Sequence, residues 1–279
     1  METSTTPHPP IVSREQWLAE RKSLLANEKE LTKHYDRVSA ERRRLPMVEI
    51  DKAYVFEGPD GTANLRDLFD GRRQLIVYHF MFDPNDAPPG KSGSPWTEGC
   101  PRCSFVADQI PHLSHLHARD TSFVLVSRAP QAKIRPFKVR MGWNIPWYSS
   151  FRSDFNYDFH VTNDEVVAPV EYNYRDKATL EREGQSYKGE QPGMSAFLRV
   201  EDRLFHTYST FARGVEPLLT TYHMLDLTAY GRQERWENSP AGWPLIPGKD
   251  GKDWVLHHDK YGEVTRGSDA CCAAAQHRS

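Results

Sequence analysis

The residues best suited to carry chemistry are Cys100 and Cys103, which stand two residues apart in the run Gly99-Cys-Pro-Arg-Cys-Ser-Phe105. A thiol reacts as its thiolate, and the free N–H groups and partial positive charge at a helix start favour that anion. Pro101 suits the first position of a helix, so Cys100 is predicted to stand just before one, with Arg102 as a nearby cation. We therefore expect a redox dithiol. Cys100, with a lowered pKa, attacks a substrate disulfide, and the more buried Cys103, with an ordinary pKa, resolves the mixed disulfide.

Two other interpretations of this pair stay open. Zinc often binds a Cys-x2-Cys pair with two further ligands, which His112, His115 or His117 would have to supply, although no second such motif exists. Alternatively, both cysteines are inert core residues. A second pair, Cys271-Cys272, lies in a tail of small residues, where it is predicted to act as a mobile resolving pair, to carry a lipid or to have no role.

Composition excludes several classes of protein. The 279 residues carry a formal net charge of −2, which is unlike the basic surface of a nucleic-acid binder. Four cysteines do not make a secreted disulfide framework, and the first residues do not resemble a signal peptide. The most apolar stretch, Leu75–Phe82, is far shorter than the roughly 20 residues that span a bilayer. We expect a cytoplasmic protein with no membrane partner, no cofactor and no resident metal.

The elements that must position the dithiol follow from hydrophobic patterns and turn residues. Strands are predicted at 47–56, 74–82, 121–127, 147–151, 195–200 and 203–209, and helices at 65–69, from 101 onward, at 131–141 and at 215–225. A strand, a loop and a helix starting at the cysteines, followed by strand, helix and hairpin, predict an α/β sandwich with a mixed central sheet. The long loop 83–99 is expected to lie over the cysteines.

A separate helical arm precedes this domain. Ser13 and Gln16 form a capping-box pattern, and Trp17, Leu24 and Leu31 begin a seven-residue apolar repeat that ends before Pro46. The repeat suits packing against the body of the same chain, and it also suits a homodimer contact.

Several motifs together resemble one family, the thioredoxin-like domain of unknown function 899, whose members are predicted dithiol-disulfide oxidoreductases. These motifs are Leu75–Phe82, Gly99–Phe105, Val126–Pro130, Ser153–Phe159 and Phe205–Gly214. The resemblance covers about Trp17 to Trp236, and there is a more distant similarity to peroxiredoxins. It implies a thioredoxin-like three-layer sandwich, which we place at 47–236. The residues outside it predict a disordered segment at 1–12, a helical arm at 13–46 and an irregular tail at 237–279.

Accessory groups are expected near the dithiol. His79 and His206 lie on predicted strands and are candidates to hydrogen-bond a thiolate, as are Tyr78, Tyr208 and Arg213. For each of them, an ordinary packed or ion-paired role is the alternative.

One departure from thioredoxins concerns the proline before the strand that faces the dithiol. In thioredoxins this proline is cis. Here the position falls near Met194, and the nearest proline is Pro192.

The sequence therefore favours a thiol–disulfide oxidoreductase that acts on a disulfide-containing or small-molecule thiol substrate and draws on an unknown electron donor. A peroxiredoxin-like thiol peroxidase using Cys100 is the first alternative. A metal-binding or interaction protein on the same scaffold is the second.

Overall fold

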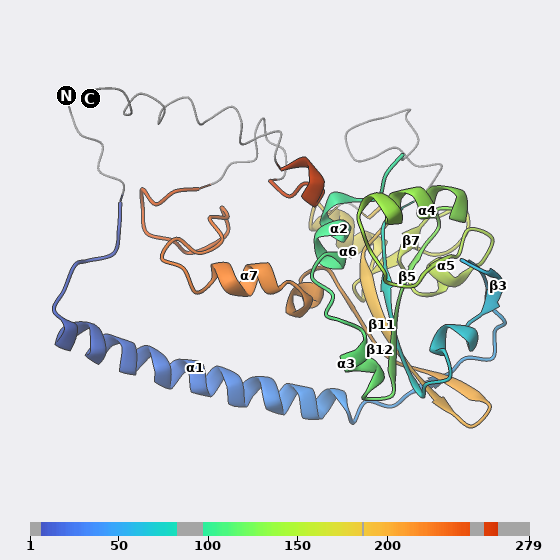
Figure 1. Cartoon of the computed structure of the whole chain (residues 1–279), viewed down its shortest axis with the longest axis horizontal. Coiled ribbons are helices and arrows are strands. Elements are labelled where there is room, and N and C mark those ends of the chain that lie inside the picture. Colours follow the sequence, from blue (N-terminus) through green and yellow to red (C-terminus); the bar gives the residue numbers. More distant parts are fainter. Residues whose placement is uncertain (1–6, 83–96, 186, 246–253, 262–279) are drawn as a thin grey trace, which may run out of the picture.

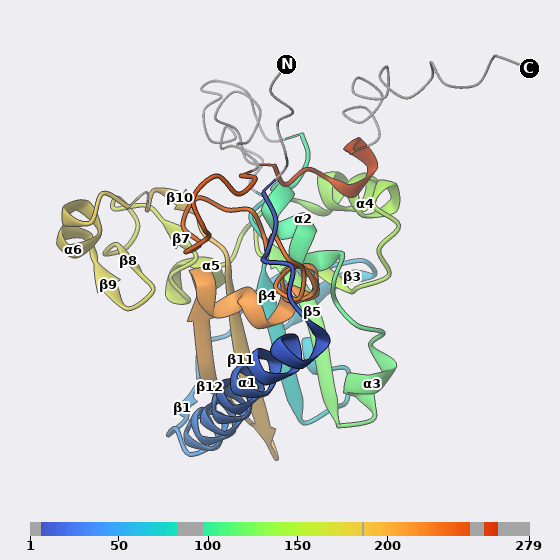
Figure 2. The same cartoon turned by 90° about the vertical axis from the view of Figure 1, so that its left-hand side faces the viewer.

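The computed structural model describes residues 7–82, 97–185, 187–245 and 254–261, and an eight-stranded mixed sheet forms its centre. The strand order is β1-β12-β11-β4-β5-β6-β2-β3. Strands β4 (Gln74–His79), β5 (Thr121–Ser127) and β6 (Trp147–Ser149) run parallel. The hairpin of β11 (Gly193–Val200) and β12 (Arg203–Phe211) lies antiparallel beside β4 (Figure 2). This arrangement confirms the expected thioredoxin-like α/β sandwich with a mixed sheet.

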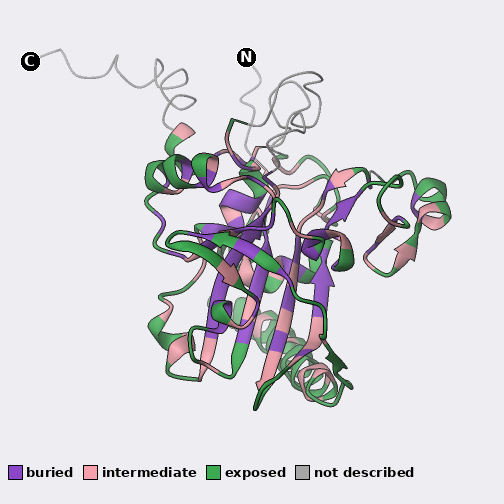
Figure 3. Ribbon diagram, turned by 90° about the vertical axis from the view of Figure 1, so that its right-hand side faces the viewer, coloured by how far each residue is buried: buried purple, intermediate pink, exposed green. Residues whose placement is uncertain are grey.

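Helices cover both faces of the sheet because its central strands are apolar on both sides. On one face, Tyr78 and Phe80 pack with Cys103 under α2 (Pro101–Ala107), α3 (Ser114–His117) and α4 (Gln131–Arg140). On the other face, Leu75 and Val77 pack under the 3-10 turn η1 (Asp67–Phe69), α5 (Phe155–Asp158) and α6 (Lys177–Arg182). Figure 3 shows the buried strands between these two layers. We call the first group the dithiol face and the second the Phe155 face.

The stretch predicted as one strand at 47–56 forms two short strands at opposite ends of the strand order, one at an edge of the sheet and one next to the other edge. Strand β1 (Val48–Glu49) pairs with β12, whereas β2 (Val55–Gly58) pairs with β3 (Gly61–Asn64) and β6. The residues between them cross the Phe155 face, where Tyr54 is buried against Phe155 with ring centroids 5.1 Å apart. Of this connection only Tyr54 is buried and Ile50 is half-buried, while residues 51–53 are exposed, so pairing does not continue through it.

Residues 150–192 contain more structure than the sequence analysis predicted. Besides α5 and α6, they form two small sheets. Strand β7 (Thr162–Asn163) pairs with β10 (Gly189–Glu190), and β8 (Glu171–Tyr172) pairs with β9 (Arg175–Asp176). Two-residue strands are too short to show a hydrophobic period, so the sequence gives little sign of them.

The helix predicted at 215–225 is interrupted. A 3-10 segment, η2 (Ala212–Leu218), precedes α7 (Thr220–Leu225). The break falls at Leu219, whose backbone (φ −93°, ψ 74°) lies outside the helical region.

The N-terminal arm forms as predicted, and α1 spans Arg14–Arg42. The Ser13 N–H donates to Gln16 Oε1 over 3.1 Å, and the Gln16 N–H donates to Ser13 Oγ over 3.2 Å, which closes the capping box. None of the residues of α1 is buried, and the apolar residues Trp17, Leu24 and Leu31 are exposed (Figures 1 and 3). At the end of the helix, the guanidinium of Arg42 contacts the ring of Tyr208 on β12. Contact with a second copy stays a prediction.

Residues 7–12 contain no helix or strand, and the rest of the predicted disordered segment lies outside the described residues.

Within the described part of the chain, no helix is both long and apolar enough to cross a membrane.

Candidate functional site

Cys100 stands just beyond the carboxyl end of β4, at the start of α2. Its N–H donates to the carbonyl of Met81 over 3.1 Å, which ties it to the chain that continues from β4. Pro101 takes the first turn of α2. The N–H and the hydroxyl of Ser104 both donate to the Cys100 carbonyl over 2.9 Å. The chain that continues from β4 therefore holds the N–H of Cys100, and α2 holds its carbonyl oxygen.

The two thiols have different surroundings. Cys103 is buried, and its sulfur accepts from the N–H of Met81 over 3.4 Å, whereas Cys100 is half-buried. The pKa of Cys100 is lowered, chiefly by a hydrogen bond from the Cys103 thiol. Hydrogen bonds from the backbone N–H groups of Cys103 and Arg102 and the charge of Arg102 lower it further, whereas burial raises it. Burial raises the pKa of Cys103 well above its usual value. The ordinary pKa expected for Cys103 is therefore corrected, because a buried thiolate loses its solvation.

Tyr78 is the strand residue that contacts the buried thiol. It is 1% exposed, and its hydroxyl hydrogen-bonds to the sulfur of Cys103. Burial raises the pKa of Tyr78 far above that of an ordinary tyrosine, so it stays protonated and acts as a donor. This bond favours the Cys103 thiolate, against the effect of burial.

The structure does not bring His79 and His206 to the thiols. Because side chains alternate along β4, Tyr78 and His79 point to opposite faces of the sheet, and His79 packs on Phe155 and Phe159. Both histidines belong to a hydrogen-bonded chain on that face. His79 Nε2 lies 2.8 Å from Ser195 Oγ, Ser195 Oγ lies 2.8 Å from Ser209 Oγ, and His206 Nε2 lies 2.7 Å from Ser209 Oγ. Burial lowers the pKa of His79 to about 3.

Two other candidates have structural partners away from the thiols. Arg213 forms an ion pair with Glu216 over 2.8 Å, and its guanidinium lies 4.5 Å from the ring centroid of Trp236. The guanidinium of Arg42 lies over the ring of Tyr208, 4.9 Å from the centroid of that ring. For both residues, the ordinary packed or ion-paired role is the one that the structure shows.

The strand position facing the dithiol is held by methionine. Met194 pairs with Tyr78 in the β11–β4 register and packs against the dithiol face. All peptide bonds in the described parts of the chain are trans. The Pro192 carbonyl accepts from the Tyr172 hydroxyl over 3.0 Å. The side chain next to the thiols on this strand is therefore apolar.

The histidines considered for a zinc site lie elsewhere. His115 and His117 belong to α3, which leads into the amino end of β5, whereas the thiols lie beyond the carboxyl end of β4. Across residues 7–82, 97–185, 187–245 and 254–261, no three His, Cys, Asp or Glu side chains gather where a metal ion could bind. Loop residues 83–96 and the pair Cys271-Cys272 lie outside the described residues.

A contact that the sequence did not predict joins the C-terminal region to the residues just before Cys100. Residues 254–261, predicted to belong to an irregular tail, lie against α2 and α4 (Figures 1 and 2). Val255 and His257 are buried, and His257 Nε2 lies 2.8 Å from the carbonyl oxygen of Gly99, the residue before Cys100. The apolar run Trp254-Val-Leu256 is too short to show a helix or strand period, so the sequence could not reveal this docking.

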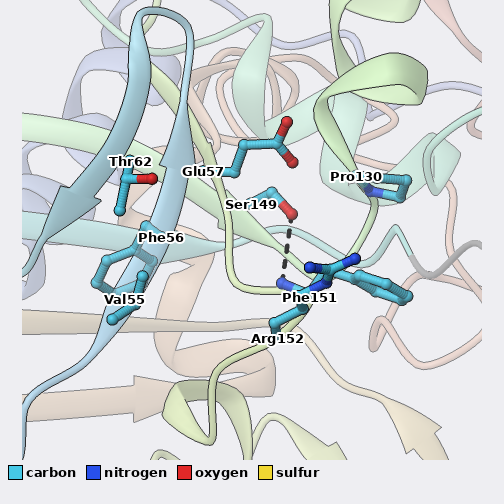
Figure 4. A pocket seen from close by; sticks show the side chains of 8 residues that line it. All are labelled: Val55, Phe56, Glu57, Thr62, Pro130, Ser149, Phe151 and Arg152. Carbon is cyan, nitrogen blue, oxygen red and sulfur yellow. Dashed lines mark hydrogen bonds between the residues drawn. The ribbon is translucent and has the colours of Figure 1, made fainter.

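A cavity of about 440 Å³ lies away from the thiols (Figure 4). Its lining comes from β2, β3, the end of β6 with the stretch after it, and the residue before α4. The lining residues are Val55, Phe56, Glu57, Thr62, Pro130, Ser149, Phe151 and Arg152. The Phe151 N–H donates to Ser149 Oγ over 3.3 Å at its wall. Neither cysteine lines this cavity, so we assign the candidate chemistry to the dithiol and not to this hollow.

Together, the sheet order and the paired thiols beyond the end of β4 define a thioredoxin-like α/β protein. The model of the family described as "Bacterial protein of unknown function (DUF899)" matches residues 6–261, so the chain belongs to that family and the resemblance identified from its motifs is confirmed. No curated protein matches the chain.

Several solved peroxiredoxins are similar to part of this chain at low identity. A cysteine-to-serine mutant of PrxQ from Xylella fastidiosa is 12% identical, with a TM-score of 0.35, over 61% of this chain and 88% of that one. Peroxidoxin BcpB from Mycobacterium tuberculosis is 14% identical, with a TM-score of 0.39, over 65% of this chain and 97% of that one. At these identities and TM-scores, the likeness carries no information on activity.

Proposed function

We propose that the protein is a cytoplasmic thiol–disulfide oxidoreductase in which Cys100 is the nucleophile and Cys103 the resolving thiol. The observation that carries this proposal is the asymmetry of the pair. A half-buried thiol with a lowered pKa accepts hydrogen bonds from a buried neighbour and from two backbone N–H groups. Such an arrangement favours the thiolate at the position that a substrate can reach.

The exchange follows from these positions in two balanced steps. The Cys100 thiolate attacks one sulfur of a substrate disulfide, the substrate S–S bond breaks, and one substrate thiolate leaves. Cys103 then loses its proton to the substrate thiolate released in the first step and attacks the Cys100 sulfur. This step releases the second substrate thiolate and leaves a Cys100–Cys103 disulfide. The substrate gains two electrons, and an external dithiol or thiol reductant returns the protein to its reduced state.

Tyr78 supports the second step. The pKa of Cys103 is raised by burial, so its thiolate forms reluctantly, and the Tyr78 hydroxyl is the side-chain donor that stabilises it. Arg102 supports the first step through its charge and its backbone N–H. We propose no direct role at the thiols for His79, His206 or Arg213.

The test of this function is a trapping experiment with Cys103→Ser. Lacking the resolving thiol, this variant is expected to accumulate a mixed disulfide on Cys100 when it meets a model disulfide such as oxidised glutathione, as read by intact-protein and peptide mass spectrometry. A parallel sample receives hydrogen peroxide. A sulfenic acid on Cys100 under peroxide, with no mixed disulfide under the disulfide substrate, would favour the thiol peroxidase instead. Stoichiometric zinc on the purified protein, with loss of fold on chelation, would contradict both.

Tyr78→Phe is expected to slow the resolving step by about tenfold to a hundredfold, the range for losing a hydrogen bond to a charged group. The first step should keep its rate, so a mixed disulfide on Cys100 should accumulate transiently in stopped reactions analysed by mass spectrometry. Tyr148→Phe is the matched control, because Tyr148 packs against the Phe155 face. Equal rates of resolution in the Tyr78→Phe and wild-type proteins would exclude this role for Tyr78.

A further inference from the structure

The loop before Cys100 is held from the C-terminal side of the chain. His257 is 2% exposed, its ring packs edge-on against Phe137 with centroids 5.4 Å apart, and its Nε2 lies 2.8 Å from the Gly99 carbonyl oxygen. A carbonyl oxygen only accepts, so Nε2 carries the proton and donates. Burial lowers the pKa of His257, which keeps the ring neutral near pH 7.

A second anchor holds the residue before Gly99. The Glu98 carboxylate accepts from Lys260 Nζ over 2.6 Å and from the guanidinium of Arg140. Arg140 also pairs with Asp259, at 2.7 Å and 3.0 Å. Residues 98 and 99 are therefore both tied to the segment Trp254–Tyr261, and α4 provides the bridging cation.

Gly99 itself leaves no room for adjustment. A Cβ atom at this position would lie 2.4 Å from Phe80 Cε1 and 2.8 Å from Phe137 Cε1, so the backbone rests directly on two core rings. The next residue, Cys100, is bonded through its N–H to the Met81 carbonyl. The peptide unit between Gly99 and Cys100 thus has its N–H bonded to one side of the site and its carbonyl bonded to His257 on the other.

We propose that His257 is a positioning residue for the dithiol, which holds the Gly99–Cys100 peptide unit so that the Cys100 sulfur faces the Cys103 thiol and the N–H groups of the first turn of α2. Without this bond, the carbonyl can turn away and the sulfur leaves its donors. The inference rests on the proposed function in treating Cys100 as the reactive thiol. The measured quantity, however, is the reactivity of that thiol and not catalytic turnover.

The experiment compares two amide variants of the full-length protein, His257→Gln and His257→Asn. The Gln amide nitrogen can stand where Nε2 stands and donate to Gly99, whereas the shorter Asn amide cannot reach that oxygen. The alkylation rate of Cys100 is measured against pH with iodoacetamide and site-resolved mass spectrometry. We expect His257→Asn to react about threefold to tenfold more slowly at pH 7, with its profile shifted to higher pH, and His257→Gln to stay near wild type.

His258→Ala is the matched control in the same segment, because His258 pairs with Asp108 over 2.8 Å and does not contact Gly99. Its alkylation profile should be unchanged. Circular dichroism and thermal unfolding establish that each variant is folded. Should His257→Asn fail to fold, Lys260→Gln removes one of the two cations that hold Glu98 and is expected to slow alkylation about twofold, because Arg140 still links Glu98 to Asp259. A wild-type profile in the folded Asn variant, or equal slowing in Asn and Gln, would overturn the proposal, whether or not disulfide exchange is the reaction.

Discussion

Cys100→Ser is expected to abolish disulfide exchange, with a loss on the order of a thousandfold or more, as when a covalent nucleophile is removed from an enzyme. A serine hydroxyl is not ionised near neutral pH, and the four features that favour an anion at position 100 cannot change that. These features are the Cys103 thiol, two backbone N–H groups and the charge of Arg102. The measurement is reduction of a model disulfide in the presence of a regenerating reductant.

The matched control removes the chain's other two cysteines together, in a Cys271→Ser, Cys272→Ser double variant. Exchange should persist in it, and its loss there with retention in Cys100→Ser would contradict the assignment.

In wild type, the alkylation rate of Cys100 should level off above a pKa that lies below about 8.5, the value of an unperturbed thiol. The rate should fall as pH drops through that lowered pKa, because only the thiolate reacts. Cys103 should stay unreactive until the protein unfolds.

Phe155→Ala is expected to lower the free energy of unfolding by about 3–5 kcal/mol, the usual cost of truncating a buried phenylalanine. Phe155 is fully buried, with ring centroids 5.0 Å from Phe56 and 4.6 Å from Phe159, and a smaller side chain leaves a cavity among rings that cannot easily close it. Urea unfolding followed by tryptophan fluorescence measures the change.

Phe151→Ala is the matched control for this prediction. Phe151 lies four residues earlier and is 39% exposed, so its truncation should change stability by no more than about 0.5 kcal/mol. Because Phe155 lies on the face of the sheet away from the thiols, the alkylation profile of Cys100 should be retained in the folded Phe155→Ala protein. A loss below about 1 kcal/mol would show that the rings do not form the packed core described here.

Local signals in the sequence predicted most of the elements. The capping box at Ser13, the apolar run that forms β4 and the hairpin of the strands predicted at 195–200 and 203–209 each depend on a few neighbouring residues, and all three agree with the structure. Predictions failed where a segment's partner lies far along the chain. Residues 47–56 look like one strand, yet β1 and β2 lie at opposite ends of the strand order.

The candidate site is likewise specified in part by local sequence signals and in part by contacts between distant residues. The sequence determined that Cys100 and Cys103 lie about one helical turn apart beside a buried strand, and strand alternation determined that Tyr78 and His79 point to opposite faces. Only the tertiary structure decided which of these two faces the thiols, because that depends on the side to which α2 packs. It also decided that His257 donates to Gly99 across 158 positions of sequence. Hydrophobic period and turn chemistry specify local conformation, whereas such distant contacts arise only when the whole core has packed.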